Sequence, residues 1–425
     1  MPPRTYPLTY FAAVVASISV ASILYNILNP TKHPNGKNTP SPLETYQSQH
    51  DASTNTQLAY PPDSFIPGTR DISTPYGSIR VYEFGSDEPS ARKVILIHGI
   101  STPCISLLGV AEGLASKGCR VMLFDLFGRG WSDAPTDLPY DNRLYTTQIL
   151  LALASSPFAW TGRDDGKGAR GFSIIGYSLG GCIAADFTSY FPELVEDLVL
   201  IAPAGLQRLS NTGWKSKLLY STGLLPEWLL ARLVKRRLRT NPIVKMPSVR
   251  GGKVAGGEAE PRQGLTKDDT TTNVDAAISA ELPEKGVIPD SASQRNIDPE
   301  GAVAFQLSHH KGFIHAFMSS IRNAPIHDQQ ARWALIGARL DAQKNNTHIF
   351  ELGEEQRSGL RSGKVLIILG EKDGIIIKDE VANDARAVLG EGNVEVKVVL
   401  GAGHEVAVSK AEEIVQSIWE LWERP

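Results

Sequence analysis

The chain has 425 residues, of which 42% are hydrophobic and 21% charged, and its net charge is −3. This is the composition of a globular protein with ample apolar material for a core, and it provides no basic field to attract nucleic acid. Three cysteines (Cys104, Cys119 and Cys182) are too few for a disulfide framework, and no Cys/His cluster has the spacing of a metal site. We expect neither a nucleic-acid partner nor a bound metal.

The amino terminus contains an apolar segment over residues 6–28, and no charged side chain lies between Arg4 and Lys32. As a helix this segment would be about 34 Å long, enough to cross a hydrocarbon core of about 30 Å. We therefore predict a membrane anchor over residues 1–30 and a single-pass membrane protein. The alternatives are a cleaved signal peptide, which would leave a secreted or lumenal protein, and a helix packed within the fold.

Short aliphatic runs with strand character follow further along the chain. Most are continuous rather than alternating, as in strands that are covered on both faces. Helical stretches lie between several of them, for example over residues 107–117, 180–190 and 410–422. Strands and helices in alternation indicate an α/β fold with a mostly parallel central sheet flanked by helices. The predicted strands are residues 78–84, 93–98, 120–124, 172–177, 198–202, 364–369 and 394–400.

The alternation stops over residues 206–361, which we interpret as a helical cap inserted into a core formed by residues 64–205 and 362–425. Within the insertion, residues near 246–300 are dominated by Gly, Glu, Lys, Asp and Thr and are predicted to be a disordered loop. Residues 31–63, rich in Pro, Asn, Thr, Ser and Gln, are predicted to be a linker. The predicted cap helices are residues 214–220, 226–239, 312–323 and 330–344.

The sharpest local signal is the run Gly176-Tyr177-Ser178-Leu179-Gly180, which lies between a predicted strand and a predicted helix. A serine at such a junction lies on a tight turn that exposes its hydroxyl above the sheet, and the flanking glycines keep side chains away. The helix that follows directs its N-terminal N–H groups at the reacting carbonyl. A bare G-x-S-x-G is also a common accidental match in a structural turn, but the strand and helix on either side favour Ser178 as a nucleophile.

A serine hydroxyl is a weak nucleophile and needs a base, which in turn needs an acceptor that fixes its tautomer. His404 lies in a Gly-rich loop directly after the apolar run that ends at Leu400. Asp373 lies in the loop after another predicted strand, and Glu371 in the same loop is the alternative acid. Loops that follow parallel strands share one edge of the sheet, so we predict a triad of Ser178, His404 and Asp373.

With its chain order Ser, Asp, His, the sequence resembles the α/β-hydrolase superfamily, specifically serine esterases and lipases with a helical cap. The resemblance covers roughly residues 65–205 and 362–425. It includes His98-Gly99 and the stretch from Asp125 to Asp133, which reads DLFGRGWSD.

The resemblance implies an oxyanion hole made by the backbone N–H groups of Ile100 and Leu179, although the HGGG form of some esterases is absent. His98 is expected to be a structural loop residue. Asp125 and Arg129 are expected to organise their own loop through local hydrogen bonds rather than to act on substrate.

These features predict a serine hydrolase of the carboxylesterase or lipase type, which cleaves a small-molecule or lipid ester through an acyl-enzyme and needs no cofactor. The apolar amino terminus and the basic amphipathic segment 226–239 (PEWLLARLVKRRLR) favour a hydrophobic or acyl substrate. Two alternatives stay open: acyl transfer on the same triad, and a non-catalytic binding protein that kept the hydrolase fold.

Overall fold

The computed structural model describes residues 17–21, 24, 37–43, 45–46, 60–62, 66–161, 171–206, 298–345, 349–351, 354–356 and 360–423. Of the predicted anchor over residues 1–30, only residues 17–21 and Leu24 belong to this set, and they are helical. Within the described residues, no helix combines the length and the apolar character that a bilayer span requires.

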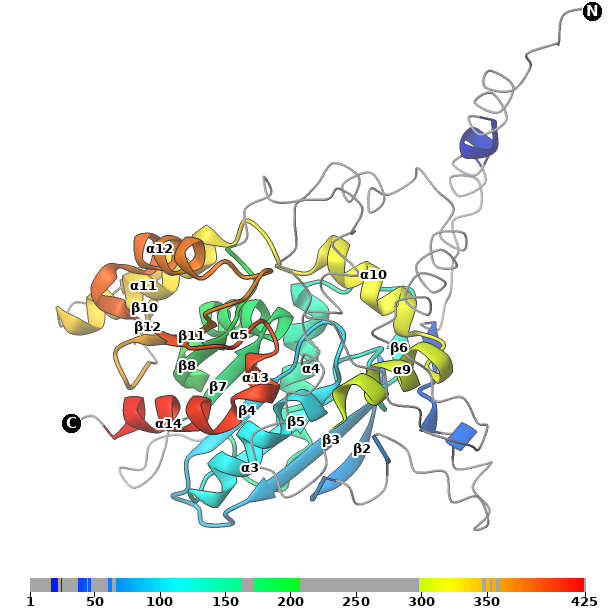
Figure 1. The fold of residues 1–425 in the computed structure, drawn as a ribbon, viewed down its shortest axis with the longest axis horizontal. Helices are drawn as coiled ribbons and strands as arrows, with labels where there is room; N and C mark the ends of the chain where they lie inside the picture. The colour runs from blue at the N-terminus through cyan, green and yellow to red at the C-terminus, as the bar shows by residue number, and fades with distance from the viewer. Residues whose placement is uncertain are drawn as a thin grey trace, which may run out of the picture.

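An eight-stranded sheet in the order β12-β11-β8-β7-β4-β5-β3-β2 forms the centre of the molecule (Figure 1). The strands from β12 to β5 run parallel, whereas β3 pairs antiparallel with both β5 and β2. All seven predicted runs form strands of this sheet, and β2 is an additional edge strand. The strands are β2 (Thr69–Thr74), β3 (Gly77–Gly85), β4 (Lys93–Ile97), β5 (Arg120–Phe124), β7 (Phe172–Tyr177), β8 (Val195–Ile201), β11 (Val365–Gly370) and β12 (Val394–Val399).

Helices cover both faces of the sheet (Figure 1). On one face α3 (Leu108–Ser116) packs against α14 (Ala411–Trp422), and on the other α5 (Leu179–Tyr190) packs against α4 (Asn142–Ala154) and α11 (Gln330–Lys344). Next to α11 lies α12 (Lys378–Leu389). Every residue of β5, β7, β8 and β11 is buried, which explains why these strands are mostly apolar. The predicted fold class is confirmed.

The insertion between β8 and β11 contributes three described helices, α9 (Pro299–His309), α10 (Phe313–Asn323) and α11. The helices predicted over residues 312–323 and 330–344 match α10 and α11. The helices predicted over residues 214–220 and 226–239 lie outside the described residues, as does the predicted loop 246–300 up to residue 297. A cap that forms a separate unit over residues 206–361 therefore stays a prediction.

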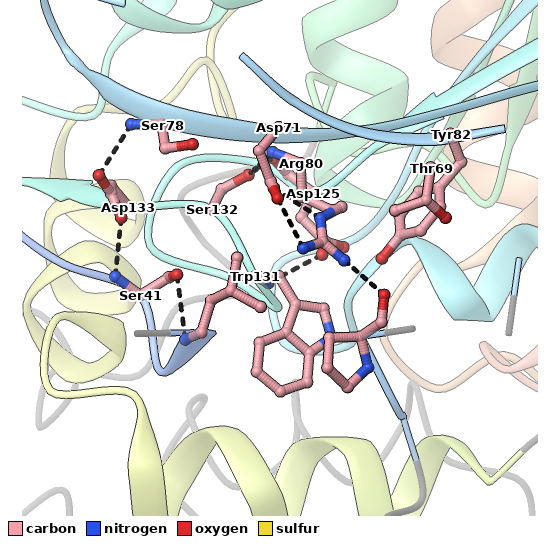
Figure 2. Close-up of polar contacts among 12 residues, drawn as sticks. Ser41, Thr69, Asp71, Ser78, Arg80, Tyr82, Asp125, Trp131, Ser132 and Asp133 are labelled. Atoms are coloured by element: carbon pink, nitrogen blue, oxygen red, sulfur yellow. Dashed lines mark hydrogen bonds and ion pairs between the residues drawn. The ribbon is translucent and has the colours of Figure 1, made fainter. Parts of the chain in front are cut away.

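Part of the predicted linker 31–63 is docked on the core. Strand β1 (Asn38–Thr39) pairs antiparallel with β6 (Ala134–Pro135). The carboxylate of Asp133 accepts hydrogen bonds from the Ser41 backbone N–H at 2.7 Å and from the Ser78 backbone N–H at 2.8 Å (Figure 2). It also accepts from the Asn38 side-chain amide at 2.8 Å. We call the described residues 37–43 and 45–46 the strap. The strap binds at the carboxyl end of β5, which is the edge of the sheet where the loops discussed below lie.

Tyr60 anchors a second part of the predicted linker. Its side chain is buried, and its hydroxyl donates to the Asp125 carboxylate at 3.0 Å. Asp125 also accepts from the backbone N–H groups of Trp131 at 2.9 Å and Cys104 at 3.0 Å. Burial raises the pKa of Asp125. Asp125 thus organises its own loop through Trp131, as predicted, and also binds Tyr60 and Cys104 outside that loop. Beside it Arg80 is paired with Asp71 (Figure 2).

Two buried carboxylates of the core differ in how they are satisfied. Asp186 on α5 is 2% exposed, and neither of its carboxylate oxygens has a hydrogen-bond partner within the part of the chain that the structure describes. Burial raises the pKa of Asp186 to about 6, against the opposing charge of Arg332. Asp197 on β8, in contrast, accepts from the Ser173 hydroxyl at 2.8 Å and pairs with Arg92 at 2.5 Å.

We predict that Asp186→Asn stabilises the protein at pH 8 by about 2 kcal/mol, because it removes a buried charge that has no partner. The folded-state pKa is raised, so Asp186 favours folding below about pH 4 and loses that contribution as the pH rises through 6. The gain from the substitution should therefore disappear near pH 4. Urea denaturation at both pH values measures this. The matched variant Asp197→Asn should instead lower the free energy of unfolding at pH 8. A higher free energy of unfolding for Asp197→Asn, or equal decreases for both variants, would show this assignment to be wrong.

Candidate active site

Ser178 lies at the turn between β7 and α5 with a backbone φ of 53°, a value that non-glycine residues rarely adopt. Its N–H donates to the carbonyl of Ile201 at 2.9 Å, and its own carbonyl accepts from Gly181 at 2.9 Å and Ala204 at 3.0 Å. The end of the neighbouring strand β8 therefore holds the turn in place. The predicted strand, turn and helix around Ser178 are confirmed.

The two glycines that flank the serine motif are required by close backbone contacts. A methyl group on Gly176 would lie 2.1 Å from the carbonyl oxygen of Gly180. A methyl group on Gly180 would lie 2.0 Å from the carbonyl oxygen of Ile97, at the end of β4. Both distances are far below van der Waals contact, so any side chain at either position would force the turn open.

The side chains of Ser178, His404 and Asp373 form one hydrogen-bonded chain. The Ser178 hydroxyl lies 2.9 Å from Nε2 of His404, and Nδ1 of His404 lies 2.8 Å from Oδ2 of Asp373. Ser178 and His404 are 226 positions apart in the sequence. All three residues are buried, with Ser178 the most exposed at 8%. The hydroxyl is positioned to give its proton to Nε2, provided that Nδ1 carries the hydrogen of the neutral imidazole.

Backbone contacts fix the orientation of the histidine and of the acid. The other oxygen of Asp373, Oδ1, accepts from the N–H groups of Ile375 and Ile376, both at 2.8 Å. The hydroxyl of Tyr177 donates to the His404 carbonyl at 2.9 Å. The aromatic hydroxyl next to the serine thus supports the histidine loop, a contact that we did not predict from the sequence.

Glu371, the alternative acid, is occupied elsewhere. Its Oε2 accepts from the backbone N–H of Gly401 at 2.9 Å, so it joins the loops that follow β11 and β12. These loops lie tightly together, since a methyl group on Gly370 would lie 2.2 Å from the carbonyl oxygen of Gly403. The geometry therefore favours Asp373 over Glu371 as the partner of His404.

The predicted oxyanion positions come from neighbouring backbone segments. Leu179 begins α5, and Ile100 lies in the loop after β4; both are buried. The close approach of Gly180 to the carbonyls of Ile97 and His98 places this loop directly against the first turn of α5. The loop that contains Ile100 and the start of α5 are therefore adjacent, and the oxyanion hole itself stays a prediction.

His98 is a structural residue, as predicted. Its Nε2 accepts from the Leu126 N–H at 2.8 Å, so Nδ1 carries the hydrogen and donates to the Gly99 carbonyl, also at 2.8 Å. Burial lowers the pKa of His98 to about 3. The residue is therefore a neutral bridge between the loops after β4 and β5.

Nothing in the described part of the site resembles a metal centre, since the residues that the structure describes contain no group of three or more His, Cys, Asp or Glu side chains that could hold an ion. Arg129 binds the Phe127 carbonyl within its own loop at 3.1 Å, as expected. It also reaches beyond that loop to the Ile100 carbonyl at 3.1 Å and to the Ser320 hydroxyl on α10 at 2.8 Å, which was not expected. A single sequence carries no signal for these distant partners.

Comparison with known proteins identifies relatives of part of the chain. A family model described as "alpha/beta hydrolase fold" matches residues 93–240. A probable 1-acylglycerol-3-phosphate O-acyltransferase from Oryza sativa is 30% identical over 146 residues, which are 34% of this chain and 33% of that protein. A serine hydrolase-like protein from Mus musculus is 26% identical over 131 residues, 31% of this chain and 38% of that protein. The chain matches 30 to 38% of the length of the curated relatives compared.

Solved structures share the fold at low sequence identity. MGS-M2, an alpha/beta hydrolase enzyme from a Medee basin deep-sea metagenome library, superposes with a TM-score of 0.50 at 14% identity, covering 84% of this chain and 98% of that one. The family model, the order of the strands and the serine turn agree with one another. This chain therefore has the α/β-hydrolase fold, and its residues 93–240 match the model of that family.

Proposed function

We propose that the protein is a serine hydrolase that cleaves ester-type substrates, with Ser178 as the nucleophile. The observation that carries the proposal is the hydrogen-bonded chain from Ser178 through His404 to Asp373, with distances of 2.9 and 2.8 Å. A buried structural serine has no need of a histidine whose other nitrogen is bound to a carboxylate. A nucleophile that must lose a proton needs this arrangement.

In the first half of the mechanism, Ser178 Oγ attacks the ester carbonyl carbon while His404 Nε2 takes the hydroxyl proton. The Asp373 carboxylate stabilises the imidazolium that results. The backbone N–H groups of Ile100 and Leu179 stabilise the negative charge on the carbonyl oxygen. The C–O bond to the alcohol then breaks, and His404 returns the proton to the leaving oxygen.

In the second half, water attacks the acyl-enzyme and gives its proton to His404. Collapse of the second tetrahedral intermediate releases the carboxylic acid and returns the proton to Ser178 Oγ. The sequence consumes one ester and one water and yields one acid and one alcohol. The residues of the chain supply every proton transfer, so the proposed reaction requires no cofactor.

We propose a carboxylesterase- or lipase-like specificity for hydrophobic acyl groups. The apolar segment over residues 6–28 and the basic amphipathic sequence of residues 226–239 support this substrate class, because both are suited to a lipid surface. A small-molecule or lipid ester is therefore the proposed substrate.

Two alternatives use the same fold. Acyl transfer would replace the water by an alcohol or thiol, and the rice relative named as a probable acyltransferase supports keeping this candidate. A non-catalytic binding protein would keep the fold without turnover. A complete hydrogen-bonded triad argues against the binding protein, because such a protein gains nothing from it.

We predict that Ser178→Ala lowers kcat for a short-chain p-nitrophenyl ester by at least about 10³-fold, because no other group can form the acyl-enzyme. The matched control is Ser189→Ala, which removes a hydroxyl from the same helix that donates only to the Asp186 carbonyl. Product analysis accompanies the assay. Equal activity of wild type and Ser178→Ala would refute the nucleophile, and an ester of an added alcohol as main product would identify a transferase.

We predict that Asp373→Asn lowers kcat by about 10³- to 10⁴-fold with little change in KM, because the histidine loses the acceptor that fixes its tautomer and stabilises its charge. The matched control Glu371→Gln keeps an oxygen that can accept from Gly401 and should stay within about threefold of wild type. Steady-state kinetics on the same ester measure both variants. If Glu371→Gln were the more damaging change, Glu371 would be the acid.

We also propose that residues 6–28 anchor the protein in a membrane as a single span. Of the described helical residues in this segment, Ile18, Val20 and Leu24 are 55, 55 and 50% exposed, so their apolar side chains are not covered by the fold. An exposed apolar helix without charges is energetically suited to lipid.

The prediction for membrane fractionation is that the full-length protein stays in the membrane pellet after alkaline carbonate extraction. A chain that begins at Lys37 keeps the strap and should move to the supernatant with its esterase activity intact. Release of the full-length protein by carbonate would contradict the anchor. A processed amino terminus found by mass spectrometry would identify a signal peptide instead.

A further inference from the structure

Arg129 is a fully buried cation in the loop after β5. Its Nε donates to the Ile100 carbonyl at 3.1 Å, one terminal nitrogen donates to the Phe127 carbonyl at 3.1 Å, and the other donates to the Ser320 hydroxyl at 2.8 Å. Within the described ranges no carboxylate lies close enough to pair with it. Burying a guanidinium without a carboxylate partner is unfavourable. Its three hydrogen bonds must therefore offset the loss of hydration, and they hold the groups that accept them in place.

The three carbonyls before Thr102 are held by three side chains from different parts of the chain. His98 Nδ1–H donates to the Gly99 carbonyl at 2.8 Å. Arg129 holds the next carbonyl, that of Ile100, and the Gln306 side-chain amide donates to the Ser101 carbonyl at 3.0 Å. This loop carries Ile100, whose N–H is one of the two proposed oxyanion donors.

Fixing carbonyls also fixes N–H directions. A trans peptide is planar with its N–H opposite its C=O, so a donor to the Gly99 carbonyl determines where the Ile100 N–H points. A hydrogen bond to a carbonyl also polarises the same peptide and strengthens its N–H as a donor. Arg129 and Gln306 hold the two peptides that follow, which prevents the loop from rotating away.

Two helices of the insertion between β8 and β11 also take part in these contacts. Gln306 lies on α9, and its side-chain oxygen accepts from the Gly130 N–H at 2.7 Å. Ser320 lies on α10; its hydroxyl donates to the Ala316 carbonyl at 2.7 Å and accepts from both Arg129 and the Tyr145 hydroxyl. The hydrogen-bonding capacity of this hydroxyl is therefore fully used, and it fixes one end of the guanidinium.

We propose that Arg129 is a positioning residue for the oxyanion hole, which holds the loop from Gly99 to Ser101 in its donor conformation and joins that loop to helices α9 and α10. The inference rests on the proposed function. Arg129 acts through Ile100 and makes no contact with substrate. Its planar fork reaches three acceptors in three directions at once, which a lysine ammonium at the end of a single stem cannot do.

The test compares an ester with the matching thionoester, in which sulfur replaces the carbonyl oxygen and gains less from oxyanion donors. For Arg129→Lys we expect kcat on the ester to fall about 10- to 100-fold with KM within about threefold, a part of the loss caused by deleting a donor. The ratio of kcat/KM for ester over thionoester should fall about tenfold, because the thionoester depends less on the hole.

A merely structural role would lower the active fraction or the melting temperature and would reduce both substrates equally, leaving the ratio unchanged. The matched control is Arg120→Lys, because Arg120 is another buried arginine and is paired with Glu83 and Asp87.

If Arg129→Lys does not fold, Gln306→Met removes the adjacent contact and should lower the same ratio by a smaller factor. An unchanged ratio in the folded variant would overturn the inference. A wild type without ester hydrolysis would overturn the proposed function and the inference with it.

Discussion

The positive backbone φ at Ser178 is the constraint on which the carboxyl edge of the sheet depends. A non-glycine residue in this conformation is unfavourable by about 1–3 kcal/mol, and the surrounding structure must hold it there. Here the end of β8 binds its N–H, Gly181 and Ala204 bind its carbonyl, and the end of β4 packs on Gly180. The same contacts that maintain the turn bring the loop after β4 next to the start of α5. The backbone conformation of Ser178 and the close approach of these two segments are therefore consequences of one packing arrangement.

The parallel sheet supplies the other half of the site. Because β7, β11 and β12 run in the same direction, the loops that follow them meet at one edge. Close glycine contacts and the Glu371–Gly401 hydrogen bond lock the acid and histidine loops together, and the Tyr177 hydroxyl ties the histidine loop back to the serine turn. Burial of the triad removes competing water from its hydrogen bonds, which strengthens them. The fold thus holds the three side chains in their hydrogen-bonded arrangement before any substrate binds.

Structural features with a local sequence pattern could be predicted, whereas features that depend on contacts between distant residues could not. Continuous aliphatic runs identified the buried strands, and a serine between a strand and a helix identified the turn. The alternating edge strand β2 lacked such a run. Asp373 and Glu371 follow the same strand two positions apart, so only the direction of each side chain separates them. Composition predicted a linker for the strap, because its docking depends on residues that are distant in sequence, namely the Asp133 carboxylate and strand β6. The partners of Arg129 are equally remote in sequence.

An activated serine nucleophile reacts covalently with fluorophosphonates, so Ser178 should be modified by such a reagent. The full-length protein would be treated with a fluorophosphonate, digested and mapped by tandem mass spectrometry. We expect a single phosphonyl adduct on the peptide that contains Ser178, formed far faster than on the unfolded protein. An unmodified Ser178, or an adduct on another residue that abolishes ester hydrolysis, would contradict it.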